Sequence, residues 1–143
     1  MRNFMKKKES VSQIASTALI TIQVGQKLSD ARKLMQVNQI HHVPVVNGTK
    51  LVGLLSAVDL ATLSVTSFGS DERANDTLLD NQFDLEEVMS KNMVTIKPTT
   101  TIREAAEMLA EGHFHSLPIV DKEGNLQGLV TSTDLIRYLL SQY

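Results

Sequence analysis

Cysteine is absent from the 143 residues of the sequence. Its absence excludes disulfides, thiolate metal sites and a cysteine nucleophile. An excess of charge of one sign is also lacking, because 14 lysines and arginines stand against 16 aspartates and glutamates and leave a formal net charge of -2. Such a balance provides no basic surface for non-specific binding to nucleic acid, so we expect no nucleic-acid partner.

Long apolar runs are lacking as well. No segment reaches the length of a membrane span, and the basic start, Arg2 to Lys8, is not followed by the continuous apolar stretch of a signal peptide. We therefore expect a cytoplasmic protein without membrane contact, in which residues 1–10 form a mobile basic N-terminus. An alternative, weak nucleic-acid binding through residues 2–8, predicts steep salt dependence and loss of binding when the first ten residues are deleted.

The sequence contains an internal repeat. Residues 14–48 align without gaps on residues 88–122, and residues 51–60 align on 126–135 after a shift of one residue. Twelve of these aligned positions are identical, where unrelated sequences of average composition would share about three. The repeat therefore indicates a duplication, with equivalent core positions in the two copies.

Each copy shows the same order of local patterns. Short extended runs at residues 19–22 and 93–96 precede an amphipathic helix, which in copy 2 begins with the capping-box spacing of Thr101 and Glu104 and stops near Gly112. Copy 1 keeps the apolar face but lacks an equally good N-cap, so we expect a weaker helix start there.

A hairpin and a second helix follow in each copy. The strands are expected at residues 43–46 and 51–55, around Asn47 and Gly48, and at residues 117–120 and 126–130, around a turn that is one residue longer. The helix is expected from Ser56 or Ala57 in copy 1 and from Ser132 in copy 2, where leucines are available for packing: Leu135, Leu139 and Leu140.

These patterns predict a mixed α/β fold of the α+β type. Two βαββα repeats, residues 11–66 and 85–143, are expected to pack as an intramolecular pseudo-twofold pair, since a unit of about 60 residues buries little surface alone. Residues 67–84 are polar and are expected to form a linker that could contain a short helix.

The most distinctive motif lies where each hairpin meets its second helix. Gly53-Leu54-Leu55-Ser56-Ala57-Val58-Asp59 corresponds to Gly128-Leu129-Val130-Thr131-Ser132-Thr133-Asp134. A hydroxyl three residues before a carboxylate is typical of a helix cap. The same groups also suit a nucleotide, because a helix N-terminus with a hydroxyl binds phosphate and a carboxylate accepts from ribose hydroxyls. Both roles remain open at this point.

The chain resembles the cystathionine-β-synthase-type regulatory domain, the CBS domain, which typically occurs as a tandem pair. The resemblance rests on the two junctions above, on Thr21-Ile22 and Thr95-Ile96, and on the segments His41-His42-Val43-Pro44-Val45-Val46 and His115-Ser116-Leu117-Pro118-Ile119-Val120. It implies two symmetry-related clefts between the copies, where adenosine ligands such as AMP, ADP, ATP or S-adenosylmethionine bind.

The resemblance also implies which residues hold the ligand. The carboxylates would bind ribose hydroxyls and the junction hydroxyls ribose or phosphate, while the residues of the extended segments and those before the prolines would border the adenine. The implied nucleotide-binding residues are Thr21, Ile22, His42, Pro44, Ser56, Asp59, Thr95, Ile96, Ser116, Pro118, Thr131 and Asp134.

One departure from the family pattern makes the copies unequal. Many nucleotide-binding members carry a basic residue just before the junction aspartate, where this chain has Val58 and Thr133. Arg137, one turn later in copy 2, is a substitute cation without a counterpart in copy 1. We therefore add Arg137 to the nucleotide-binding residues and expect the site of Thr131 and Asp134 to be the more competent one.

Catalysis and metal binding are not expected. The sequence has no nucleophile elbow, no phosphate-cradling glycine-rich loop and no zinc-binding His-Glu helix, so we predict no catalytic residue. Its histidines are His41, His42, His113 and His115. The first two are neighbours on an extended segment and point to opposite faces, which favours packing or nucleotide contact over a metal site.

The expected function is that of a non-enzymatic sensor with no required cofactor. An adenosine-containing ligand in the cleft would shift the population of conformations that an unidentified regulated protein recognises. The apolar second helices favour a homodimer. The alternative is an assembly or scaffold module with a vestigial cleft, in which the hydroxyl and carboxylate pairs serve only as helix caps.

Overall fold

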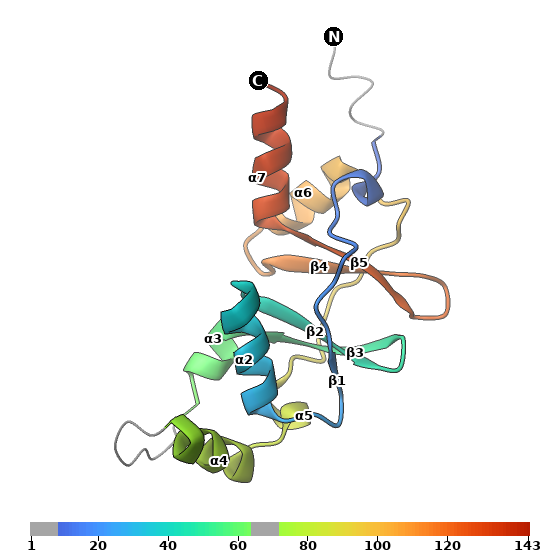
Figure 1. The fold of residues 1–143 in the computed structure, drawn as a ribbon. Coiled ribbons are helices and arrows are strands. Elements are labelled where there is room, and N and C mark those ends of the chain that lie inside the picture. The colour runs from blue at the N-terminus through green and yellow to red at the C-terminus, as the bar shows by residue number, and fades with distance from the viewer. Residues whose placement is uncertain (1–8, 64–71) are drawn as a thin grey trace. The chain divides into compact units, whose positions relative to one another are not determined.

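The computed structural model describes residues 9–63 and 72–143. The chain divides into two compact units. We call residues 20–92 the middle unit, and residues 1–19 together with 93–143 the terminal unit, because it holds both ends of the chain. Figure 1 labels the helices and strands of each.

The middle unit is built on a three-stranded sheet in the order β1-β2-β3. β1 (Ile22–Gln23) is parallel to β2 (His42–Asn47), which pairs antiparallel with β3 (Lys50–Ser56). The helices are α2 (Leu28–Asn38), α3 (Ala57–Ala61), α4 (Glu72–Gln82) and α5 (Leu85–Val88). Fully buried side chains from α2 and the strands form the core, among them Ile22, Leu28, Ala31, Val43, Val45 and Leu55.

The terminal unit repeats this plan with a two-stranded sheet. β4 (Ser116–Val120) pairs antiparallel with β5 (Leu126–Thr131), and Ile96 forms a single parallel bridge to Ile119. The helices are α6 (Ile102–Ala110) and α7 (Ser132–Ser141), preceded near the N-terminus by the 3-10 turn η1 (Val11–Gln13). The core contains Val11, Ala105, Leu117, Ile119 and Val130.

The duplication extends to the pairing register. Val45 lies opposite Gly53 with a bulge after Val45, and Ile119 lies opposite Gly128 with a bulge after Ile119. The mixed α/β fold of two repeats is therefore confirmed. The first extended run is shorter than the predicted residues 19–22 and 93–96 and begins later in the middle unit, where Ile22 and Gln23 pair. In the terminal unit, Ile96 forms the corresponding bridge.

The turns of the two hairpins differ in their means of stabilisation. Asn47 pairs with Lys50, so Gly48, with φ +66°, and Thr49 form a turn two residues shorter than predicted. In the longer turn of copy 2, the backbone N–H groups of Asn125 and Glu123 donate to the Asp121 carboxylate. These hydrogen bonds, the one from Asn125 first, lower the pKa of Asp121.

The N-caps of the two first helices differ, as their sequences predict. Thr101 caps α6, because its side chain accepts from the Glu104 N–H while Glu104 accepts from the Thr101 N–H. The N-cap of α2 is Lys27, whose side chain makes no capping hydrogen bond. Asp80 of α4 supplies the missing acceptor, since the Ser29 N–H and hydroxyl donate to its carboxylate at 3.0 and 2.5 Å.

Helix α4 lies in the segment that we predicted as a linker. Figure 1 shows it beside α2, and the two helices are in contact. Leu79 is buried in the core of the middle unit, and Asp76 forms an ion pair with Arg32 of α2. The part of this segment that is described is therefore a packed helix of 11 residues. Residues 67–71 lie outside the described part of the chain.

The structural units do not coincide with the sequence repeats, because each repeat lends its first segment to the other unit. Val11, from the start of repeat 1, is buried in the core of the terminal unit. Its counterpart at the start of repeat 2, Leu85, lies in the core of the middle unit, as does Met89 of the same segment. The first segment of each repeat is therefore packed in the unit that is formed mainly by the other repeat. We call these two segments, which begin at Val11 and Leu85, the exchanged segments.

Hydrogen bonds hold the first segment on the terminal unit. The Ile102 N–H donates to the Glu9 carbonyl at 2.8 Å, and Ser10 forms an isolated antiparallel β-bridge with Thr101. The Tyr138 hydroxyl donates to the Glu9 carboxylate at 2.5 Å, which with burial raises the pKa of Tyr138. Glu9 and Ser10, the last two residues of the segment that we predicted as mobile, thus contact the terminal unit. Residues 1–8 lie outside the described part.

Gly53 permits the second exchanged segment to dock. A Cβ built on Gly53 would lie 2.9 Å from the Met89 Cγ, whereas one on Gly25 would have nothing within 4 Å. We therefore expect Gly53→Ala to lower the free energy of unfolding by about 1–3 kcal/mol through overpacking, as measured by urea denaturation. Gly25→Ala is the matched control, and an equal loss in both variants would contradict the docking role of Gly53.

Candidate functional site

The junction in the middle unit is a complete capping box. The Ser56 Oγ accepts from the Asp59 N–H at 3.0 Å, and the Asp59 Oδ2 accepts from the Ser56 N–H at 2.9 Å. The first N–H of α3, that of Ala57, donates to the His41 carbonyl at 2.8 Å. Strand β2, strand β3 and helix α3 are thus joined at one point.

The junction in the terminal unit has the same arrangement with one additional bond. The Asp134 Oδ2 accepts from the Thr131 N–H at 2.8 Å and from the Thr131 hydroxyl at 3.1 Å, and the Thr131 Oγ1 accepts from the Asp134 N–H at 3.2 Å. The Ser132 N–H donates to the His115 carbonyl at 3.3 Å. The capping role inferred from the sequence is therefore confirmed in both copies.

Capping leaves part of each carboxylate available. Within the described residues, the hydrogen bonds at both junctions use Oδ2 of Asp59 and of Asp134, and none involves Oδ1. Both aspartates are half-buried. The remaining oxygen of each can accept from a ligand hydroxyl without opening the cap, so the two roles are compatible.

A second predicted residue lies across the strand from each capping hydroxyl. His42 is opposite Ser56 and Ser116 is opposite Thr131, and directly opposed residues point to the same face of an antiparallel sheet. His42 is half-buried, whereas Ser116 is 4% exposed. The structure therefore brings each pair of junction residues together with its predicted strand neighbour.

The apolar members of the predicted set are buried in the cores. Ile22 and Pro44 in the middle unit, like Ile96 and Pro118 in the terminal unit, expose little or none of their side chains. These residues can reach a ligand only through their backbone or after a local shift. Thr21 is half-buried and Thr95 is exposed, so their side chains are more accessible.

The cation predicted for the second site is available. Arg137 lies on α7 three residues after Asp134 and is exposed to solvent. The corresponding turn after Asp59 consists of Leu60, Ala61 and Thr62, the C-cap of α3, and these residues carry no charge. The electrostatic difference between the two junctions is therefore present in the folded chain.

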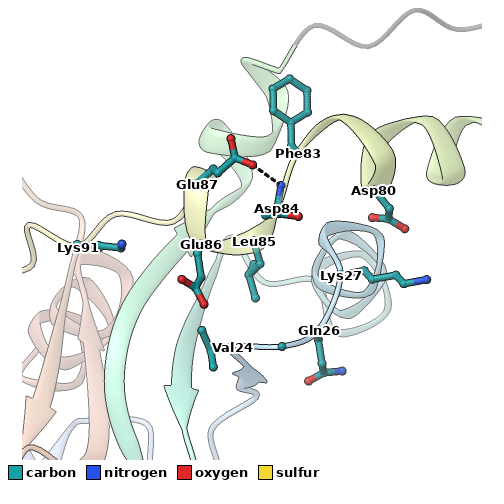
Figure 2. Close-up of a pocket in the computed structure, with 11 residues that line it drawn as sticks. Val24, Gln26, Lys27, Asp80, Phe83, Asp84, Leu85, Glu86, Glu87 and Lys91 are labelled. Carbon is teal, nitrogen blue, oxygen red and sulfur yellow. Dashed lines mark hydrogen bonds between the residues drawn. The ribbon is translucent and has the colours of Figure 1, made fainter.

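A pocket of about 660 Å³ lies elsewhere in the middle unit. Figure 2 shows it between the loop of residues 24–27 and residues 83–87, with the Leu85 and Glu86 side chains directed toward the loop. Its lining includes none of the predicted nucleotide-binding residues. Four of its lining side chains are acidic and two are basic, which does not suit a phosphate: Asp80, Asp84, Glu86 and Glu87, with Lys27 and Lys91.

The structure adds contacts that the sequence analysis missed. The carbonyls of His41 and His115 accept from the helix starts, and Asp80 accepts from Ser29. Backbone acceptors leave no sequence signal, and Asp80 is 51 residues from its partner. Within residues 9–63 and 72–143, no three His, Cys, Asp or Glu side chains are grouped to hold a metal ion. The same residues include no helix long and apolar enough to cross a membrane.

The fold and its paired junctions define a mixed α/β protein made of two copies of one repeat. A model of the CBS domain matches residues 11–65 and 85–141. The chain therefore belongs to the CBS domain family.

The similarity extends to proteins of different lengths. A CBS domain-containing protein of Dictyostelium discoideum is 32% identical over 134 residues, which cover 91% of this chain and 90% of that protein. The homoserine O-acetyltransferase of Methanohalobium evestigatum is 34% identical over 131 residues, but these are 90% of this chain and only 24% of that enzyme. The chain thus spans about a quarter of the Methanohalobium enzyme and nearly the whole of the Dictyostelium protein.

A solved CBS domain pair shares the fold. The pair of protein MJ0100, crystallised with 5′-methylthioadenosine and S-adenosyl-L-methionine, is 25% identical to this chain, with a TM-score of 0.76. The likeness covers 94% of this chain and 98% of that one.

Proposed function

We propose that this protein is a regulatory module that binds an adenosine-containing ligand at its two strand-to-helix junctions. The observation that carries the proposal is the capped carboxylate, which keeps one oxygen for a ligand hydroxyl in each unit. Both ligands of the MJ0100 pair contain adenosine, which supports the same ligand class here. Signalling to a regulated protein and a cytoplasmic location are parts of the proposal.

The residue roles follow from the groups at each junction. Asp59 and Asp134 bind ribose hydroxyls, and Ser56 and Thr131 contact ribose or phosphate. The adenine is bordered by the remaining residues of each unit, mainly through their backbone. These are Thr21, Ile22, His42 and Pro44 in the middle unit, and Thr95, Ile96, Ser116 and Pro118 in the terminal unit. Arg137 neutralises phosphate in the terminal unit, where we therefore place the tighter site.

A thermal-shift panel separates ligand binding from the scaffold alternative. We expect at least one of AMP, ADP, ATP and S-adenosylmethionine to stabilise the protein, by about 2.7 kcal/mol at 100 times its Kd, because a ligand of the native state shifts the unfolding equilibrium. Guanosine and cytidine monophosphates serve as controls for non-specific anion effects. Unchanged melting temperatures with all four adenosine compounds would favour the scaffold.

A homodimer through α7 is a further part of the proposal. Leu135 packs on the core, but Ile136, Leu139, Leu140 and Tyr143 are 57%, 54%, 67% and 95% exposed at i, i+3, i+4 and i+7 spacing. A stripe of this kind indicates a contact surface.

We expect Leu140→Glu to convert the dimer to a monomer, as measured by light scattering. Val37→Glu, at an exposed valine of α2, is the control and should leave the dimer intact. A monomeric unmodified chain would contradict this part.

The proposal contains no catalytic step. The junctions hold hydroxyls, carboxylates and a guanidinium, but the hydroxyls and one oxygen of each carboxylate are engaged in capping, and the guanidinium is exposed on α7. The Dictyostelium relative, which has nearly the same extent, bears a CBS domain name without an activity. We therefore propose a sensor and no enzyme.

A further inference from the structure

Each exchanged segment ends on a strand that leads to a proposed ligand site. The Ser16 N–H donates to the Leu129 carbonyl at 3.0 Å, and the Leu129 N–H donates to the Ser16 carbonyl at 3.1 Å. Leu129 lies on β5, two residues before Thr131. The backbone of Ser16 is therefore fixed to the strand that carries the capping residue of the terminal site.

The equivalent bridge occurs in the middle unit. The Ser90 N–H donates to the Leu54 carbonyl at 2.8 Å, and the Leu54 N–H donates to the Ser90 carbonyl at 3.0 Å. Leu54 lies on β3, two residues before Ser56. Ser16 and Ser90 are aligned positions of the duplication, so both sites have the same attachment.

Five residues after each bridge, the chain reaches the other proposed site. Residues 17–20 connect Ser16 to Thr21 and Ile22 of the middle unit, and residues 91–94 connect Ser90 to Thr95 and Ile96 of the terminal unit. The five residue steps from Ser16 to Thr21, like those from Ser90 to Thr95, span at most about 18 Å when fully extended. We call these two segments the connectors.

The far end of each connector is also fixed. Ile22 pairs with Val45 on β2, and the Ile96 N–H donates to the Pro118 carbonyl at 2.9 Å. One end of each connector is therefore bonded to the strand that carries a capping hydroxyl. The other end is bonded, in the other unit, to the strand that carries a predicted adenine contact.

Packing holds Ser16 and Ser90 in place on the strands to which they are bonded. Val11 and Leu85, which precede the two bridges by five residues, are 0% and 3% exposed. A Cβ on Gly128 would lie 3.2 Å from the Ser16 carbonyl oxygen, so that strand and segment are already in close approach. A shift of β5 on ligand binding would therefore carry Ser16 with it.

We infer that the two connectors couple the proposed ligand sites, so that occupancy of one junction changes the ligand affinity of the other. This inference rests on the proposed function. A ligand that moves the strand end at Thr131 displaces Thr21 through residues 17–20, and residues 91–94 provide the reverse path. Because coupling of binding is reciprocal, each site changes the affinity of the other by the same factor.

The test uses a tryptophan reporter, since the sequence contains no tryptophan of its own. Val58→Trp reports the middle site and Thr133→Trp the terminal site, at aligned positions beside the two aspartates. Ligand affinity at the middle site is measured by fluorescence titration with S-adenosylmethionine and AMP, first with Asp134 intact and then with Asp134→Asn, which weakens binding at the terminal site.

We expect Asp134→Asn to change the Kd of the middle site by at least about fivefold. Insertion of two glycines after Ala18 and after Asn92 is expected to reduce this change to less than twofold. Two glycines inserted after Glu123, in the turn whose length already differs between the copies, are the control and preserve the coupling. If the inserted chain fails to fold, Thr17→Gly with Lys91→Gly loosens the connectors at constant length and must reduce the coupling.

The possible failures are distinguishable. If both reporters respond to a ligand but the Kd of the middle site does not change with Asp134→Asn, the coupling is overturned and the proposed function remains intact. Coupling that survives in the connector variants, or binding at one junction only, would also overturn it. No response at either reporter with either ligand, in a folded chain, would remove the proposed function and the coupling together.

Discussion

Leu85→Ala is expected to destabilise the middle unit, which contains most of repeat 1, although Leu85 belongs to repeat 2 in the sequence. Leu85 is 3% exposed and lies in the core cluster that includes Leu28 and Leu55. Removal of a buried leucine side chain costs about 2–5 kcal/mol, from lost apolar burial and from the cavity that remains. The free energy of unfolding, measured with urea, should fall by this amount.

Hydrogen exchange locates the effect. We expect backbone amides of β2 and β3 to lose protection in Leu85→Ala, while those of β4 and β5 keep theirs. Val11→Ala provides the reciprocal case, since Val11 is fully buried in the terminal unit. Val37→Ala, at a valine of α2 that is 73% exposed and lies outside the proposed dimer surface, should change stability by less than about 0.5 kcal/mol. Loss of protection confined to residues 102–141 in Leu85→Ala would contradict the exchange of segments.

Asp134→Asn is expected to weaken ligand binding by about 10- to 100-fold with little loss of stability. An asparagine oxygen can still accept from the Thr131 N–H and preserve the cap, but it no longer offers a charged acceptor to the ribose. Hydrogen bonds to charged groups contribute about 1.5–3 kcal/mol, which corresponds to this range of Kd. Calorimetric titration with the ligand found in the thermal-shift panel measures the effect.

Two further variants separate capping from binding. Asp134→Ala removes both, so it should weaken the ligand similarly and also lower stability by about 0.5–2 kcal/mol. Asp59→Asn, at the junction without a nearby arginine, should reduce total affinity less than Asp134→Asn does. Equal affinity of Asp134→Asn and the unmodified protein would show that the terminal junction is only a cap.

The parts of the fold that sequence reasoning predicted are those determined by neighbouring residues. The capping boxes at Thr101 and at both junctions depend on groups three residues apart, and they form as predicted. The hairpins follow from the turn at Gly48 and from the apolar strands beside it. The aligned repeat also predicted equivalent core positions in the two copies, and the hairpins that carry them share their pairing register around Val45 and Ile119.

The features that were missed depend on contacts between distant segments. Val11 and Leu85 are apolar in equivalent positions, but an apolar residue does not indicate which of two similar sheets will bury it. The cap of α2 by Asp80 likewise requires that α4 pack on α2, which no local pattern reveals. At the candidate site, Pro44 and Pro118 were predicted to border the adenine, but both are fully buried within the continuous apolar runs of β2 and β4.

The most direct test of the central claim is an NMR titration of the folded chain with S-adenosylmethionine and AMP, followed through backbone amide shifts. The account predicts the largest shifts at residues 56–59 and 131–134, with the latter responding at lower ligand concentration. Shifts centred on residues 24–27 and 83–87, the pocket of Figure 2, or no shifts with either ligand, would contradict binding at the junctions.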